Sequence, residues 1–360
     1  MMDIAGILNI PPYSLDRKGK SALLDPFFSD LTQYHYNNNT AYKKILDADG
    51  FFSNHTKSYA DIPFLPVRLF KMFDLYSVKK EEIIKTMYSS GTTGQAVSKI
   101  FLDRETSANQ TKALTRIVSS FIGKQRIPML IIDSESVVKD RTAFSARAAG
   151  ILGFSIFASK KTYALNENME LDIEAVLDFF ETHKGMRVFL FGFTFVVWQH
   201  FYKECIAKGV ELDLSDSVLI HGGGWKKLKN ESVSSNDFKE GLKNVCGIKE
   251  VYDYYGMVEQ TGSIFMECEY GKLHAPVFSD VIIRRPVDFS VADKGETGLI
   301  QVLSVLPHSY PGHSLLTEDE GILHGEDDCS CGRYGKYFSI TGRIKNAEIR
   351  GCSDTYAAGF

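Results

Sequence analysis

Residues 188–224 read VFLFGFTFVVWQHFYKECIAKGVELDLSDSVLIHGGG and contain one complete strand–helix–strand unit. The apolar run Val188–Phe191 predicts a buried strand, and Phe195–Lys208 predicts the helix that follows it. Val218–Ile220 predicts a second buried strand, which runs into three consecutive glycines. Strands of near-continuous apolar character that are joined through a helix are typical of a parallel sheet with both faces covered.

The same alternation of strands and helices continues on both sides of this unit. Leu171–His183 predicts a helix, and Asp172 is a suitable N-cap for it. The other predicted elements are helices at 106–124 and 238–245 and strands at 129–132 and 251–254. This order predicts an α/β fold with layered, mostly parallel sheets and helices.

The sequence changes character after about residue 277. Val281–Arg284 and Gly298–Leu306 predict two strands, and Leu315–Thr317 and Gly321–Leu323 add further β character. We therefore expect an α/β body over residues 1–276, a smaller β-rich subdomain over 277–350 and a mobile C-terminal tail over 351–360.

Composition excludes several classes of protein. The 360 residues are 44% hydrophobic and 24% charged, with a net charge of −4, which excludes a disordered chain and gives no basic field for nucleic acid. No apolar run reaches the roughly 20 residues that span a bilayer, and the N-terminus does not resemble a secretory signal. Six cysteines are too few for a disulfide scaffold. We expect a cytoplasmic protein with reduced thiols.

The strongest local motif is a Ser/Gly/Thr-rich loop that a lysine, Lys99, follows. Small residues let the backbone approach a polyphosphate, and consecutive N–H groups and hydroxyls can bind it. A downstream lysine can neutralise phosphate charge. Taken alone, a loop of this composition is more often a solvated turn than a phosphate-binding loop. The loop residues are Ser89, Ser90, Gly91, Thr92, Thr93 and Gly94.

This loop resembles the phosphate loop of the adenylate-forming (ANL) enzymes, which include acyl-CoA synthetases, luciferases and peptide-synthetase adenylation domains. Three further motifs of that superfamily follow in order: Tyr254-Tyr255-Gly256-Met257-Val258-Glu259, Leu316-Thr317-Glu318-Asp319 and Thr341-Gly342-Arg343-Ile344-Lys345. The resemblance implies ATP and Mg²⁺ as cofactors. It implies that Glu259 holds Mg²⁺, that Tyr255 stacks on adenine beside Gly256, and that Asp319 and Arg343 bind the ribose. Val258 and Glu318 depart from the superfamily pattern, which has Thr and Gly there.

A narrower resemblance comes from His221-Gly222-Gly223-Gly224-Trp225-Lys226, which is similar to the G-G-G-W-K segment of acyl-protein synthetases. These enzymes activate fatty acids in bacterial bioluminescence and have relatives outside it. The resemblance implies a chain without the mobile C-terminal domain of acyl-CoA synthetases. It also implies a fatty or other carboxylic acid as substrate and an acyl reductase as partner protein.

Cys352 lies close to the C-terminus and follows a glycine. In acyl-protein synthetases a cysteine at such a position takes the acyl group as a thioester, so the resemblance implies this role for Cys352. A thiolate is a suitable nucleophile for the carbonyl of an acyl-adenylate. The alternative is an unreactive cysteine in a frayed tail.

Three other cysteines and a histidine form a candidate metal site. Three thiolates and one imidazole complete a tetrahedral zinc site, and four protein ligands would make such a site structural. The two segments are similar to those of some phenylacetate-CoA ligases. The alternative is three unrelated cysteines and a surface histidine. The four residues are Cys268, His274, Cys329 and Cys331.

The sequence therefore predicts a ligase that activates a carboxylic acid as an acyl-adenylate and passes the acyl group to a cysteine thiol. Catalysis is assigned to Cys352, Lys99 and Glu259. One alternative is a compact acyl- or aryl-CoA ligase that releases a CoA thioester. The other, from a different class, is a non-catalytic nucleotide-binding subunit that organises a partner protein.

Overall fold

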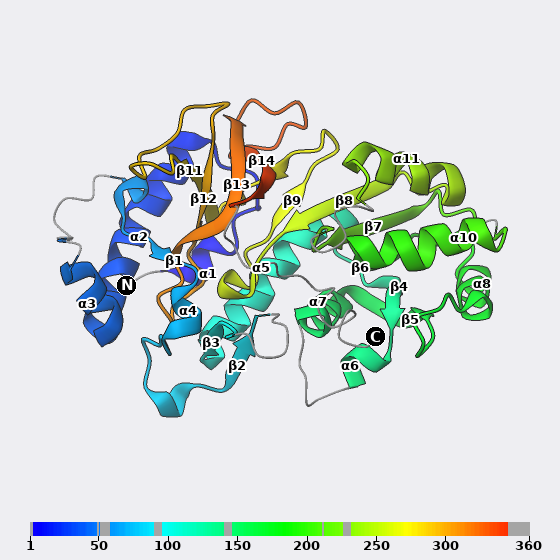
Figure 1. The fold of residues 1–360 in the computed structure, drawn as a ribbon, viewed down its shortest axis with the longest axis horizontal. Helices are drawn as coiled ribbons and strands as arrows, with labels where there is room; N and C mark the ends of the chain where they lie inside the picture. The colour runs from blue at the N-terminus through cyan, green and yellow to red at the C-terminus, as the bar shows by residue number, and fades with distance from the viewer. Residues whose placement is uncertain are drawn as a thin grey trace. The chain divides into compact units, whose positions relative to one another are not determined.

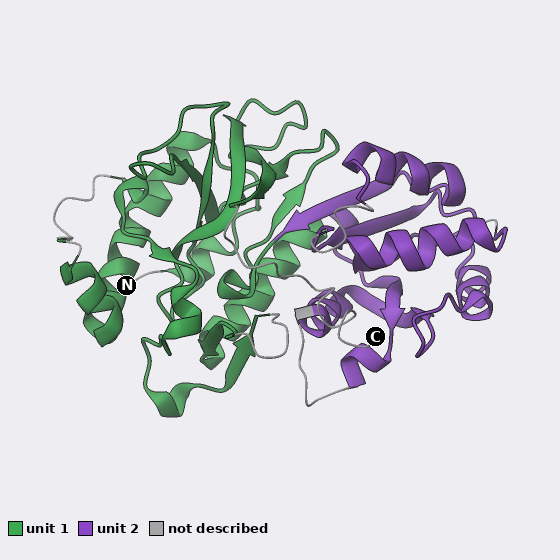
Figure 2. Cartoon of the chain, in the orientation of Figure 1, with its two compact units in different colours: residues 1–89, 96–120, 256–348 green, residues 90–95, 121–255, 349–360 purple. Residues whose placement is uncertain are grey.

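The computed structural model describes residues 3–48, 50, 58–89, 96–139, 146–210, 212–225 and 232–344. The chain divides into two compact units that do not follow the order of the sequence (Figure 2). Unit 1 takes residues 1–89, 96–120 and 256–348, and unit 2 takes 90–95, 121–255 and 349–360. The predicted boundary between residues 276 and 277 falls inside unit 1 and stays a prediction.

Unit 2 contains a five-stranded parallel sheet in the order β5–β4–β6–β7–β8 (Figure 1). Helix α7 packs on β6 and helix α8 on β5. All residues of β6 and β7 are buried, as expected for strands that are covered on both faces. The strands are β4 (Ile127–Ser134), β5 (Ala158–Leu165), β6 (Val188–Phe193), β7 (Ser217–Gly222) and β8 (Glu250–Tyr255). The predicted parallel α/β arrangement is confirmed.

The helices of unit 2 alternate with these strands. Asp172 caps α8 by accepting a hydrogen bond from the Ala175 N–H at 3.0 Å, as the sequence predicts. The predicted helix 195–208 instead has three parts, because a π-helical segment, Val197–Tyr202, separates α9 from α10. The α-helices are α6 (Ser136–Lys139), α7 (Ala146–Phe154), α8 (Ile173–Thr182), α9 (Thr194–Val196), α10 (Lys203–Ala207) and α11 (Ser235–Cys246).

Unit 1 contains an antiparallel sheet in the order β11–β12–β13–β14–β10–β9, and β1 joins β13 in parallel. A separate antiparallel hairpin is formed by β2 (Lys85–Tyr88) and β3 (Lys99–Leu102). The two β segments predicted at 315–317 and 321–323 are one long strand, β13. The other strands are β1 (Leu65–Pro66), β9 (Phe265–Glu267), β10 (Leu273–His274), β11 (Ser279–Arg284), β12 (Thr297–Ser304), β13 (Ser314–Glu326) and β14 (Lys336–Arg343). The β-rich character predicted after residue 277 is confirmed.

The helices of unit 1 begin near the N-terminus. The spacing of apolar residues over 27–46 predicts one helix, but the structure has two, which Asn39 separates. Asn39 leaves the helical conformation, and its side-chain oxygen accepts a hydrogen bond from the Tyr42 N–H at 2.8 Å, which favours a new helix start. The helices are α1 (Ile4–Ile7), α2 (Arg17–Asn38), α3 (Thr40–Ala48), α4 (Leu69–Met72) and α5 (Arg104–Ile122).

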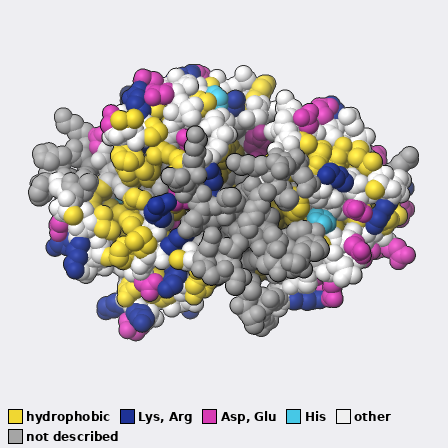
Figure 3. Space-filling model, viewed as in Figure 1, with side chains coloured by type: hydrophobic (Ala, Val, Ile, Leu, Met, Phe, Trp, Pro, Cys, Tyr) yellow, Lys and Arg dark blue, Asp and Glu magenta, His cyan; other side chains and the backbone are white. Residues whose placement is uncertain are grey.

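The surface of the described residues shows no continuous basic stripe on the face in Figure 3, where Lys and Arg side chains alternate with Asp and Glu. Among the described helices, none combines the length and the apolar character that crossing a membrane requires.

Candidate active site

A buried acidic group lies in unit 1, where the turn Val258–Gln260 and strand β13 supply three carboxylates. Glu259, Glu318 and Asp319 are 4%, 7% and 9% exposed. The Gln260 amide fixes the turn by donating to the carbonyls of Val302 at 3.1 Å and Gly312 at 2.9 Å. The Tyr310 hydroxyl donates to the Glu259 carbonyl at 2.9 Å. The turn that carries Glu259 is thus tied to the sheet by side-chain hydrogen bonds.

Two arginines pair with the carboxylates of β13. Asp319 lies opposite Arg343 in the β13–β14 ladder, and Arg343 Nε donates to Asp319 Oδ1 at 2.6 Å. Arg68 pairs with Glu318, with 2.9 Å between Nη2 and Oε1. The structure therefore brings together Asp319 and Arg343, the two residues that the sequence predicts at one ribose. It also shows that Glu318, at the position where the superfamily has glycine, is an ion-pair partner.

Glu259 differs from its two neighbours, because none of the described Lys, Arg or His side chains lies within ion-pair distance of its carboxylate. Burial raises the pKa of Glu259, a hydrogen bond from the Ser98 side chain and the nearby charge of Arg343 oppose the shift, and Glu318 adds to it. A buried carboxylate without a cationic partner is costly to ionise. A hard divalent cation with oxygen ligands would favour the ionised form, so Glu259 fits a Mg²⁺ ligand.

The predicted phosphate loop is only partly described. Residues 90–95 lie outside the described residues, whereas Ser89 and Lys99 lie inside them. Ser89 and Ser98 are joined by two hydrogen bonds, from Ser89 N to Ser98 O at 3.1 Å and from Ser98 N to Ser89 Oγ at 2.9 Å. Lys99 forms an ion pair of 3.0 Å with Asp74, and both side chains are substantially exposed. The hairpin β2–β3 thus holds the two ends of the loop together.

In unit 2 the glycine-rich segment lies at the carboxyl end of β7. Gly222 is paired with Tyr254 of β8, and a Cβ on Gly222 would lie 2.5 Å from the Tyr254 ring, so only glycine fits. Gly223 and Gly224 have φ of 86° and 61°, in the region that glycine favours. Tyr255 ends β8, and Gly256 begins the next segment of unit 1. Ligands of open parallel sheets bind at these carboxyl ends.

Thr194 contacts the start of the glycine-rich segment, and the sequence did not predict this contact. Its Oγ1 lies 2.9 Å from His221 Nδ1 and donates to the Gly222 carbonyl at 3.1 Å. Burial lowers the pKa of His221 to about 3, so the imidazole is neutral at pH 7. The only sequence feature that could have pointed to Thr194 is its place between two phenylalanines of an apolar run. The π-helical segment that follows was also missed, although such segments are frequent at functional sites.

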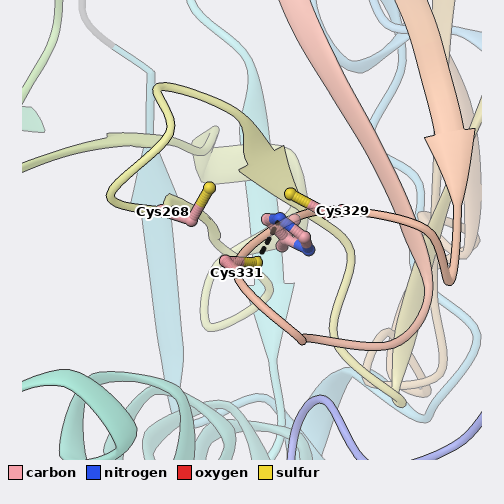
Figure 4. Close-up of side chains that lie close together, drawn as sticks. Cys268, Cys329 and Cys331 are labelled. Carbon is pink, nitrogen blue, oxygen red and sulfur yellow. Dashed lines mark hydrogen bonds between the residues drawn. The ribbon is translucent and has the colours of Figure 1, made fainter.

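The four predicted zinc ligands form a cluster in unit 1 (Figure 4). The Sγ atoms of Cys268, Cys329 and Cys331 and one ring nitrogen of His274 all lie within 4.8 Å of one another. Burial lowers the pKa of His274 to about 4, so this imidazole is neutral at pH 7. We call these four residues the thiol–imidazole cluster.

Of the three remaining cysteines, the structure describes Cys205 and Cys246 but not Cys352. The apolar neighbours of Cys205 and Cys246 predict that both pack in the core, and both are buried, in α10 and α11. Cys352 lies outside the described residues, and its predicted role stays a prediction.

Comparison with known proteins adds the following findings. A family model described as "Acyl-protein synthetase, LuxE" matches residues 2–360. A long-chain-fatty-acid–luciferin-component ligase of Vibrio harveyi is 23% identical over 340 residues, which cover 91% of this chain and 85% of the relative.

Two solved structures share the fold. A 2-hydroxyisobutyryl-CoA ligase in complex with 2-HIB-AMP and CoA matches with a TM-score of 0.71 at 15% identity, covering 93% of this chain and 77% of that one. ATP-bound MatB from Rhodopseudomonas palustris matches with a TM-score of 0.50 at 15% identity, covering 76% and 50%. The fold is therefore that of adenylate-forming ligases.

Proposed function

The chain belongs to the acyl-protein synthetase family LuxE, a family of ligases, and from that premise we propose that it activates a fatty acid with ATP and Mg²⁺ and then takes the acyl group on Cys352. The observation that carries the first step is the buried Glu259 carboxylate, which forms no ion pair with a described Lys, Arg or His side chain and lies near the Asp319–Arg343 pair. The printed name of the Vibrio harveyi relative supports a long-chain fatty acid as substrate.

In the first step an oxygen of the fatty-acid carboxylate attacks the α-phosphorus of ATP. The bond between that phosphorus and the oxygen bridging to the β-phosphorus breaks, and pyrophosphate leaves with the bonding electrons. Glu259 would hold Mg²⁺, which when bound would offset charge on the phosphates. The loop 89–94 and Lys99 bind the phosphates. These groups act by positioning and charge stabilisation and form no covalent bond with the substrate.

The nucleoside is held by a second set of residues. Tyr255 stacks on adenine next to Gly256, and the glycine-rich segment 222–224 at the end of β7 contributes backbone rather than side chains to the nucleotide site. Asp319 accepts hydrogen bonds from the ribose hydroxyls, and Arg343 orients the Asp319 carboxylate through the bond at 2.6 Å. An oriented, charged acceptor makes stronger hydrogen bonds than a neutral one.

In the second step the sulfur of Cys352 attacks the carbonyl carbon of the acyl-adenylate. The bond from that carbon to the phosphate oxygen breaks, AMP leaves, and the thiol proton passes to solvent. The product is a thioester on the protein itself. A thioester is an activated acyl group, which suits transfer to an acyl reductase as partner.

We predict where the acyl group goes when CoA is offered as a competing acceptor. Incubation with Mg-ATP, a long-chain fatty acid and CoA is expected to give a protein-bound thioester, which intact-protein mass spectrometry would detect. The amount of soluble acyl-CoA should not exceed that of a control reaction without ATP. Continuous formation of soluble acyl-CoA over many turnovers, without a protein adduct, would contradict the proposal and identify a CoA ligase.

A further inference from the structure

The thiol–imidazole cluster joins two segments of unit 1 that lie far apart in the sequence. Cys268 follows β9 and His274 ends β10, whereas Cys329 and Cys331 lie in the connection between β13 and β14. Strand β10 pairs with β14, with His274 opposite Tyr337, which brings the two segments together. A metal held by all four residues would clamp the connection 327–335 onto the β9–β10 hairpin.

The two cysteine segments have the same local geometry. The Gly271 N–H donates to the Cys268 carbonyl at 2.9 Å, and the Gly332 N–H donates to the Cys329 carbonyl at 3.0 Å. Both glycines have positive φ, 70° and 76°, which makes each turn tight. The two tight turns therefore present Cys268 and Cys329 in the same way, one from each of the two segments.

The spacing of the ligand atoms also fits a metal. In a tetrahedral zinc site with Zn–S of about 2.3 Å, neighbouring ligand atoms lie about 3.7 Å apart. The four atoms already lie within 4.8 Å of one another, and Cys331 Sγ is 3.3 Å from His274 Nε2 (Figure 4). The cluster therefore needs to contract by only about 1 Å.

The surroundings of the cluster match its expected charge and access. Three thiolates and one Zn²⁺ leave a net charge of −1, and the Arg333 guanidinium interacts with Cys331 while also donating to Glu269 at 2.7 Å. The His274 ring stacks on Tyr337, with centroids 5.6 Å apart, which fixes its plane. Cys268 and His274 are buried, and Cys329 and Cys331 are only partly covered, so an ion can enter from that side.

From these observations we propose that Cys268, His274, Cys329 and Cys331 bind one Zn²⁺ with a structural role. Four protein ligands leave no open coordination position, so the ion takes no part in the acyl chemistry. The ion instead stabilises the connection between β13 and β14. Asp319 and Arg343 lie on these two strands, at the end of the ladder that is farther from this connection. None of the four residues has a role in the proposed acyl transfer, so zinc binding does not depend on the proposed function.

The test uses the full chain, purified under reducing conditions without chelator. We expect about one zinc per chain by elemental analysis, released by a mercurial that modifies thiols. Replacing zinc with Co²⁺ should give the visible bands of a tetrahedral site and thiolate charge-transfer absorption. Removing the metal is expected to lower the midpoint of thermal unfolding by about 10 °C, because the ion binds only the folded state.

Variants assign the ligands. Cys331→Ser, at a partly exposed position, should keep the fold and lower the thiolate charge-transfer intensity to about two thirds, whereas Cys268→Ser should abolish zinc retention. Cys205→Ser and His324→Gln are matched controls, because neither residue belongs to the cluster, and both should retain zinc. A wild-type chain that takes up neither zinc nor cobalt when reduced, or that carries a disulfide among these cysteines after purification in reductant, would overturn the proposal.

Discussion

Glu259→Gln is expected to slow carboxylate-dependent pyrophosphate release by about 10²- to 10³-fold, the range seen when one preorganised charge-stabilising group is removed. Glutamine keeps the size of the side chain but removes the negative charge that we assign to Mg²⁺ binding. The loss should be smaller at high Mg²⁺ concentration if the substitution weakens metal binding. The measurement is a coupled pyrophosphate assay with Mg-ATP and a fatty acid.

The same substitution is expected to stabilise the metal-free protein at neutral pH. Because burial raises the folded-state pKa of Glu259, the unfolded chain loses this proton more readily than the folded chain as pH rises. The free energy of unfolding of the wild type therefore decreases as the pH rises from the unfolded-state pKa of Glu259 to its folded-state pKa. Glu259→Gln has no group that titrates there and does not show this decrease. The unfolding midpoint of the variant should exceed that of the wild type by more at about pH 7.5 than at about pH 4.5.

Glu105→Gln is the matched control for both measurements, because Glu105 is an exposed glutamate in the first turn of α5 of the same unit. It should leave pyrophosphate release unchanged and shift the unfolding midpoint little at either pH. Equal activity of Glu259→Gln and the wild type would remove Glu259 from the mechanism. Lower stability of Glu259→Gln at neutral pH would show that its carboxylate has a cationic partner in the protein.

The second large effect concerns the acyl acceptor. Cys352→Ala is expected to abolish the acyl-sized mass gain that the wild type shows with Mg-ATP and a fatty acid, because the thiol is the proposed nucleophile. Neutral hydroxylamine should remove the wild-type adduct, as it does for thioesters. Acid activation should persist in the variant, since the first step does not use the thiol.

Ser353→Ala is the local control for this experiment, because it alters the neighbouring residue and keeps the thiol. It should be acylated as the wild type is. An adduct that persists in Cys352→Ala and is sensitive to hydroxylamine would place the acyl group on another cysteine. Retained pyrophosphate release without any adduct in the wild type would rule out a carrier cysteine.

Several features could be predicted from the sequence because they depend on neighbours along the chain. The buried strands around 188–222 are continuous apolar runs. The glycines at the end of β7 mark positions where close packing or a positive φ requires glycine. The thiol–imidazole cluster was predicted because its four residue types are sufficient for one metal, and the structure brings their ligand atoms within 4.8 Å.

Other features depend on contacts between distant segments and left little trace in the sequence. The ion pair of Arg68 with Glu318 joins residues 250 positions apart, and Gln260 holds the Glu259 turn through two distant carbonyls. Strand β5 was missed because its first residues are exposed and charged, so it lacks the apolar run of its neighbours. The break at Asn39 was missed because the apolar positions on either side continue a helical spacing.

Exchange of labelled pyrophosphate into ATP tests the central claim most directly, because it reports reversible formation of an acyl-adenylate without any acceptor. The account predicts exchange that requires a fatty acid, that continues in Cys352→Ala and that is strongly reduced in Glu259→Gln. Exchange that proceeds equally without any carboxylic acid, or no exchange with fatty acids of any chain length, would contradict it.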